Sequence, residues 1–174
     1  MRDVKTLASG LFVALMFTGC GGGNDGSQAP KVRFTSMVSF GDSLSDVGTY
    51  QVGTVNALGG GKWTVNSATA KNWTELLSAQ LGVAAPCPAV KGLNGGTVGG
   101  GYNFNVPPVS NSACTNYAQG GSRISNPIGP GNATLDALTG TTPSVGALTY
   151  PISTQIANHL TLVNGAFSGT ELVT

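Results

Sequence analysis

Short apolar runs and amphipathic stretches alternate along this chain, and the alternation predicts strands followed by helices. A first apolar run that includes Met37, Val38 and Phe40 predicts the end of a buried strand. The last residues, 171–174, predict the start of another strand. Helical patterns lie between these two runs, so the order indicates an α/β fold with a parallel sheet.

Two segments, 71–82 and 150–165, have apolar residues at helical spacing. The residues that share a face are Trp73, Leu76, Leu77 and Leu81 in the first segment, and Ile152, Ile156, Leu160 and Val163 in the second. Gly82 and Gly165 are placed to end the helices, and Pro151 suits a first helical turn. We expect both apolar faces to be buried against the sheet.

Between these segments, residues 86–113 have the composition of a long loop. The stretch contains Gly95-Gly96 and Gly99-Gly100-Gly101. Neither glycine cluster continues into the Gly-Lys-Ser/Thr of a phosphate-binding loop or shows dinucleotide-binding spacing. We therefore expect an irregular excursion that is functional or mobile, without a nucleotide site.

The N-terminus has the organisation of an export signal. Arg2 and Lys5 precede an apolar run over 7–17, which is shorter than the roughly 20 residues that cross a bilayer. The run ends in Phe17-Thr18-Gly19-Cys20, which resembles the lipobox of bacterial lipoproteins. This resemblance implies a signal peptide over 1–19, a lipid on Cys20 and export to the cell envelope.

A flexible tether over 20–35 would follow the anchored cysteine, since residues 21–30 are rich in Gly, Ser, Asn and Pro. The alternative is a simple cleaved signal in which Cys20 has no special role. Cys87 and Cys114 remain as an even pair in an exported protein, so a disulfide between them is favoured. Two free thiols are the alternative, and the cysteines lack the spacing of a metal site.

Charge is low and balanced. Only 9% of the 174 residues are charged, and without the signal peptide six basic residues face six acidic ones. This balance gives no electrostatic basis for binding nucleic acid or strongly charged substrates. The 40% of apolar residues is enough for a packed core, and about 140 residues remain for one domain, 36–174.

The segment 38–48 places a serine where the first strand breaks into a loop. It reads Val-Ser-Phe-Gly-Asp-Ser-Leu-Ser-Asp-Val-Gly, and Ser43 would lie at the carboxyl end of the strand, where α/β sheets bind ligands. The segment resembles block I of the GDSL, or SGNH, family of serine esterases and lipases, most closely the phospholipase, lecithinase and haemolysin branch. The resemblance implies that Ser43 is the nucleophile and that its backbone N–H contributes to the oxyanion hole.

A second segment, 116–123, follows the predicted long loop and reads Asn-Tyr-Ala-Gln-Gly-Gly-Ser-Arg. It resembles block II of the same family, in which a glycine N–H also donates to the oxyanion. The spacing from Asn116 assigns this role to Gly121, with Gly120 as the alternative. Glycine suits the role because the backbone must approach the substrate closely.

The resemblance covers residues 36–174 and implies a flavodoxin-like, three-layer α/β/α sandwich with a parallel sheet, incomplete at its C-terminus. The family also uses a Gly-x-Asn-Asp block and an Asp-x-x-His block after block II, and the residues that follow 116–123 contain neither. We therefore expect an N-terminal part of a longer protein, essentially inactive by itself. His159, the only histidine, is expected at the surface or boundary of its helix without a catalytic role.

For the parent protein, the resemblance implies hydrolysis of small-molecule or lipid carboxylic esters through an acyl-serine on Ser43. No metal or organic cofactor is implied, and the membrane is approached through the lipid on Cys20. The alternative function is that of a non-catalytic surface lipoprotein that binds glycan or lipid through a degenerate hydrolase domain.

Overall fold

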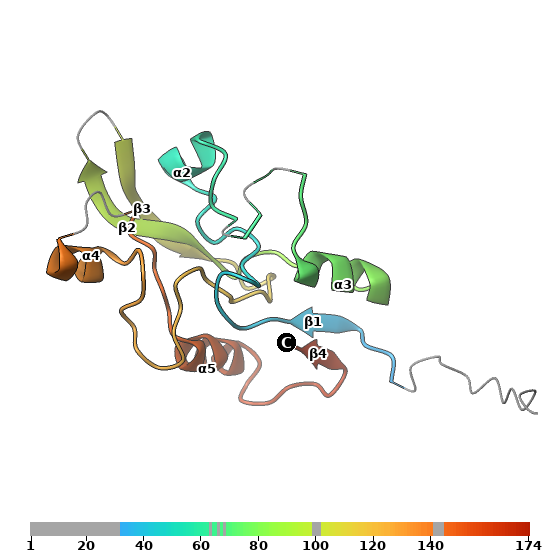
Figure 1. Cartoon of the computed structure of the whole chain (residues 1–174). Coiled ribbons are helices and arrows are strands. Elements are labelled where there is room, and N and C mark those ends of the chain that lie inside the picture. The colour runs from blue at the N-terminus through green and yellow to red at the C-terminus, as the bar shows by residue number, and fades with distance from the viewer. Residues whose placement is uncertain (1–31, 63, 66, 68, 99–101, 141–144) are drawn as a thin grey trace, which may run out of the picture. The chain divides into compact units, whose positions relative to one another are not determined.

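A computed structural model of the chain describes residues 32–62, 64–65, 67, 69–98, 102–140 and 145–174 (Figure 1). The predicted signal peptide at 1–19 and the predicted lipidation site Cys20 lie outside the described residues. The elements, in chain order, are β1 (Ser36–Val38), α2 (Gly53–Ala57), α3 (Trp73–Leu81), β2 (Val90–Val98), β3 (Tyr102–Ser110), α4 (Ala133–Thr139), α5 (Ile152–Leu162) and β4 (Glu171–Val173).

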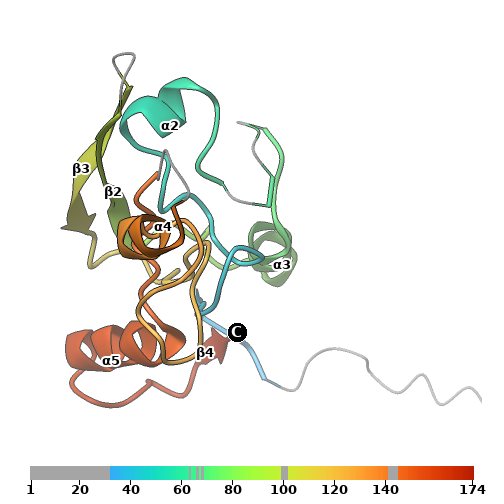
Figure 2. The same ribbon diagram turned by 60° about the vertical axis from the view of Figure 1, so that its left-hand side comes forward.

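The predicted first strand, β1, is part of a small parallel sheet. β1 pairs in parallel with β4, with Met37 opposite Leu172, and the two strands lie side by side in both views (Figures 1 and 2). On the other side of β1, Ser39 forms a parallel bridge with Asn116, and Asn116 forms another with Pro88. The prediction of a mixed α/β chain with parallel pairing and a final strand is confirmed.

The segment predicted to be a long loop is instead largely an antiparallel hairpin of β2 and β3. Leu93 and Phe104, from the two strands, are buried in one hydrophobic cluster with Tyr50 and Leu148. The register shifts between Lys91 and Leu93 and again between Asn94 and Thr97. Such irregularities interrupt the alternation of buried and exposed positions, which is why the sequence pattern did not reveal the strands.

Helix α3 is present where predicted, but it does not bury the predicted face. The side chain of Asn72 accepts from the N–H groups of Thr74 and Glu75, and Glu75 reaches back to the Asn72 N–H, which completes a capping box. Gly82 ends the helix in the left-handed conformation at φ 67°. Thr74 and Ser78 are the buried residues of this helix, whereas Trp73 is 44% exposed.

Helix α5 also confirms its predicted position and contradicts its predicted face. Its buried residues are Gln155 and His159, while Ile156 is exposed. The two apolar stripes are therefore not fully buried as predicted. Trp73, Leu76 and Ile156 are exposed, and the other members of the stripes are half-buried: Leu77, Leu81, Ile152, Leu160 and Val163. On α5, Gln155 bonds to the backbone of a neighbouring loop at Gly41, which needs hydrogen-bond partners. On α3, the hydroxyls of Thr74 and Ser78 bond to Asn72 and Glu75, within the helix and its cap.

Candidate active site

The turn after β1 has the geometry expected for displaying a serine. Gly41 has φ 140°, a conformation that side-chain-bearing residues rarely adopt. The carbonyl of Asp42 accepts from the Ser45 N–H at 3.2 Å, and its carboxylate accepts from the Leu44 N–H at 3.0 Å. These bonds turn the chain tightly around Ser43.

Ser43 is half-buried at the tip of this turn. Its carbonyl oxygen accepts a hydrogen bond from the Thr64 hydroxyl. Within the described part of the chain, neither its hydroxyl nor its backbone N–H has a hydrogen-bond partner. Both groups at the predicted nucleophile are therefore uncommitted.

Asp46 ties the two sequence motifs together. Its side chain is 1% exposed and accepts from the N–H groups of Gly48 and Thr49, each at 2.8 Å. It also accepts from the N–H of Gly120 at 2.9 Å. Burial raises the pKa of this carboxyl, and the hydrogen bonds from Thr49, Gly48 and Gly120 act in the opposite direction. The motif alone indicated no role for Asp46, which acts as a bridge between segments.

The hydrogen bond from Gly120 to Asp46 gives the two adjacent glycines different roles. The N–H of Gly120 is used by Asp46, and Gly120 is buried. Gly121 is half-buried with φ 82°, and its N–H has no acceptor among the residues that the structure describes. A Cβ at Gly121 would collide with the carbonyl oxygen of Pro130. Of the two glycines weighed from the sequence, Gly121 has the available donor.

Gln155 of α5 forms hydrogen bonds with the backbone of Gly41, the residue that starts the turn. Its Oε1 accepts from the Gly41 N–H at 2.8 Å, and its Nε2 donates to the Gly41 carbonyl at 2.9 Å. The N–H of Gln119 donates to the same carbonyl at 3.1 Å. Three segments distant in sequence therefore meet at the residue that starts the turn. No sequence signal indicated this use of Gln155.

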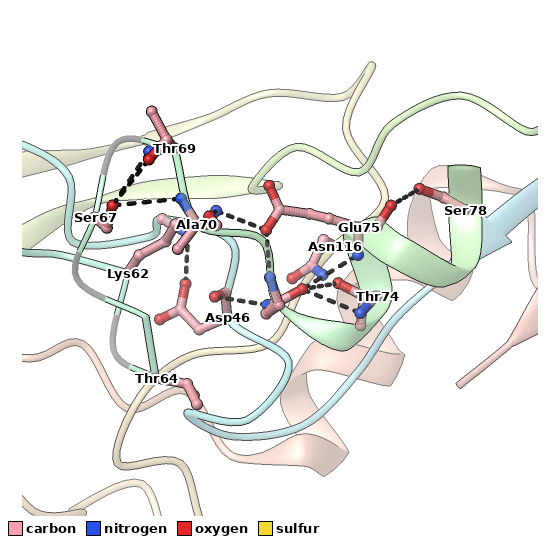
Figure 3. Close-up of polar contacts among 12 residues, drawn as sticks. Asp46, Lys62, Thr64, Ser67, Thr69, Ala70, Thr74, Glu75, Ser78 and Asn116 are labelled. Atoms are coloured by element: carbon pink, nitrogen blue, oxygen red, sulfur yellow. Dashed lines mark hydrogen bonds and ion pairs between the residues drawn. The ribbon is translucent and has the colours of Figure 1, made fainter. Parts of the chain in front are cut away.

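A second network supports the other flank of the turn, as Figure 3 shows. The side chain of Asn72 donates to the Asp46 carbonyl at 3.1 Å, and Asn116 donates to the Ser45 carbonyl at 2.9 Å. Lys62, which is 6% exposed, forms an ion pair with Glu75 at 2.6 Å. The capping box of α3 is thus continuous with the bonds that fix the serine turn.

His159 is not the surface residue expected from the sequence. It is 2% exposed and lies against the rings of Phe40, Tyr117 and Phe167, with centroid distances of 5.8, 5.4 and 5.1 Å. Its Nδ1 is 3.3 Å from the Tyr117 hydroxyl, while its Nε2 is buried without a partner among the described residues. Desolvation lowers its pKa, and the charge of Glu171 opposes that shift.

Both ring nitrogens of His159 are enclosed by other residues. Within the described part of the chain, no hydrogen bond joins this histidine to Ser43. The expectation that it has no catalytic role remains a prediction. The correction concerns its location: the spacing of Gln155 and His159, four residues apart, places both on the buried face of α5.

The structure joins Cys87 and Cys114 by a disulfide with a Cα–Cα distance of 5.1 Å. The bond closes a segment with a sequence separation of 27 that contains the whole β2–β3 hairpin. Closing a loop of this length removes entropy from the unfolded chain and stabilises the fold by roughly 3–4 kcal/mol.

Among the described residues, no group of three or more His, Cys, Asp or Glu side chains could hold a metal ion. The same residues include no helix that is both long and apolar enough to cross a membrane. In comparisons with known proteins, no family model matches the chain and no curated protein is significantly similar to it.

Proposed function

We propose that this chain carries the nucleophile half of a serine ester hydrolase of the GDSL, or SGNH, type. The observation that carries the proposal is that the hydroxyl and N–H of Ser43, on a tight turn after β1, and the N–H of Gly121 all have no partner among the described residues. Asp46 connects the two segments by accepting from Gly120. The parallel pairing of β1 and β4 is compatible with the larger three-layer sandwich that belongs to this proposal.

In the proposed reaction, the Ser43 hydroxyl attacks the carbonyl carbon of an ester. The C–O bond to the leaving alcohol breaks, and an acyl-serine remains until water hydrolyses it. The N–H groups of Ser43 and Gly121 would donate to the oxygen that gains negative charge in the tetrahedral intermediate. Each such donor accelerates the reaction by roughly 10²–10³-fold in known hydrolases.

A serine hydroxyl needs a base, because at neutral pH it is a weak nucleophile. The Ser43 hydroxyl bonds to no imidazole or carboxylate in the described residues, and the sequence has no Asp-x-x-His. We therefore expect the 174-residue chain to show only residual turnover. The base and the acid that orients it are not assigned to any residue of this chain.

The test is hydrolysis of p-nitrophenyl butyrate by the full reading frame that contains these residues. Ser43→Ala should reduce turnover by at least about 10³-fold, because the acyl-enzyme can no longer form. Ser45→Ala, in the same turn, is the matched control and should retain most of the activity. Equal turnover in the Ser43→Ala variant and the parent would refute the assignment.

We also propose that the protein is exported and anchored through a lipid on Cys20. The basic residues, the short apolar run and Cys20 in the lipobox-like sequence support this proposal. In a bacterial host, Cys20→Ala should move the protein from the detergent-extracted membrane fraction to the soluble fraction, since the anchor is lost. An unchanged distribution would favour the simple cleaved signal.

A further inference from the structure

A pocket of about 460 Å³ opens between the end of the β2–β3 hairpin and helix α5. Its polar and aromatic lining comes from Ser110, Asn111, Ser112, Tyr117, Tyr150, Thr154 and Asn158. No Asp, Glu, Lys or Arg is among the residues that line it, and its volume lies in the roughly 300–1,000 Å³ range of small-molecule sites. Ser43 does not line it, so the pocket is separate from the proposed active site.

The hydrogen-bonding groups of this pocket are largely unused. The side chains of Ser110, Ser112, Thr154 and Asn158 are exposed and have no hydrogen-bond partner among the described residues. The amide of Asn111 is already used, because it bonds to the Ala113 N–H and to the sulfur of Cys114. Three hydroxyls and one amide can each donate and accept, and together they require a ligand with many neutral donors and acceptors. A charged ligand would find no counter-ion in this lining.

The pocket also has an apolar component. Tyr117 and Tyr150 contribute rings, and Val90 and Leu162 add aliphatic surface. Tyr117 is held in place by stacking on Phe40, with centroids 5.5 Å apart, and by the bond between its hydroxyl and His159. Because Tyr117 is only 6% exposed, the half-buried ring of Tyr150 is the aromatic surface beside the free hydroxyls and the amide, and it matches a ligand with C–H faces and a hydroxylated edge.

A second pocket in this protein has a more apolar lining and serves as a comparison. It measures about 430 Å³, and its lining combines Val52, Pro88, Val106, Pro107 and Val109 with the two disulfide cysteines, Lys91 and Asn111. An acyl chain in the first pocket would remove four unpartnered polar side chains from water, whereas the second pocket, with only two polar side chains, imposes a smaller penalty of this kind. The first pocket therefore favours a polar ligand over an acyl chain.

We propose that the pocket between the hairpin and α5 binds a neutral saccharide, of the size of one or two pyranose rings. Asn158, exposed on α5, supplies donors and an acceptor for the sugar hydroxyls, and the ring of Tyr150 contacts the C–H faces. This site is additional to ester hydrolysis and does not depend on it.

Ligand-observed NMR on the whole chain tests the proposal, with cellobiose and chitobiose as the probes and 1-octanol as the apolar comparison. At least one disaccharide should bind. Asn158→Leu should weaken that binding about tenfold or more, because Leu has nearly the same shape but offers no hydrogen bonds. Ser153→Ala, an exposed change on the same helix outside the pocket, should leave binding unchanged, as should Ser43→Ala.

Thr154→Val supplies a second variant at the same wall and should also weaken disaccharide binding. Absence of binding by both disaccharides to the folded chain would overturn the proposal. So would octanol binding that Asn158→Leu strengthens, since that result identifies an apolar site. Because Ser43→Ala abolishes only the ester hydrolysis, failure of the sugar site and failure of the proposed function give different results.

Discussion

At the scale of single residues, Gly120 and Gly121 are neighbours with different surroundings. Gly120 is buried and donates its N–H to Asp46, whereas Gly121 is half-buried and keeps its N–H available. The two glycines are adjacent in the sequence, and the sequence alone did not decide which of them donates its N–H to the oxyanion. Their difference arises from a carboxylate that lies 74 positions earlier in the chain and is brought there only by folding.

Gly121→Ala should lower the free energy of unfolding more than Gly82→Ala does. Both glycines have positive φ, 82° and 67°, so both substitutions introduce backbone strain of roughly 1–2 kcal/mol. A methyl group at Gly82 meets nothing within 4 Å, while at Gly121 it collides with the Pro130 carbonyl. Urea denaturation measures both changes, and equal losses would contradict the close packing around Gly121.

At the scale of elements, both amphipathic helices bury polar side chains and expose part of their apolar stripe. On α5 the buried Gln155 bonds to both backbone groups of Gly41, while the adjacent Ile156 is 36% exposed. Apolar spacing predicts a helix well because it reports the helical period. It does not determine which face is buried when the neighbouring element is a loop with unpaired backbone groups.

Gln155→Leu should destabilise the protein by roughly 2–4 kcal/mol, because the N–H and carbonyl of Gly41 lose their side-chain partner. Ile156→Gln should change the free energy of unfolding by less than about 1 kcal/mol, since Ile156 is partly in solvent already. Thermal and urea unfolding of the two variants give the comparison. The reverse order would support the face predicted from the sequence.

At the scale of the whole molecule, the buried His159 makes stability depend on pH. Its pKa is lowered from the ordinary 6.5, so below pH 6.5 the folded state binds fewer protons than the unfolded state. Stability should therefore fall as the pH drops through 6.5, until the lowered pKa of the folded protein is reached. The groups that face His159 are the rings of Phe40, Tyr117 and Phe167 and the carboxylate of Glu171.

Glu171 acts in a different pH window. Hydrogen bonds from the side chain and backbone of Ser168 lower its pKa from 4.5 to about 2, so its contribution is lost only as the pH falls from 4.5 towards 2. His159→Gln should remove the dependence just below pH 6.5 and leave the lower window. Urea unfolding across pH 7.5 to 3 checks this, and an unchanged slope just below pH 6.5 would show that His159 is not its source.

Local patterns predicted much of the framework. The apolar run at β1, the strand at β4 and the positions of α3 and α5 all follow from nearest-neighbour preferences, periodicity and helix-ending residues such as Gly82. The β2–β3 hairpin was missed because two register shifts hide the alternation of its strands. The surroundings of His159 were missed because three of its contacts come from other parts of the chain.

The alternation of strand and helix and the position of Ser43 just after the first strand could be predicted from the sequence, because each depends on residues close together in the chain. The buried helix faces, the glycine N–H that stays available and the residues that meet at the turn became known only from the folded structure. Asp46, Gln155 and Asn116 act across 74, 114 and 71 positions, respectively. Such contacts depend on how the whole chain packs, and no local pattern records them.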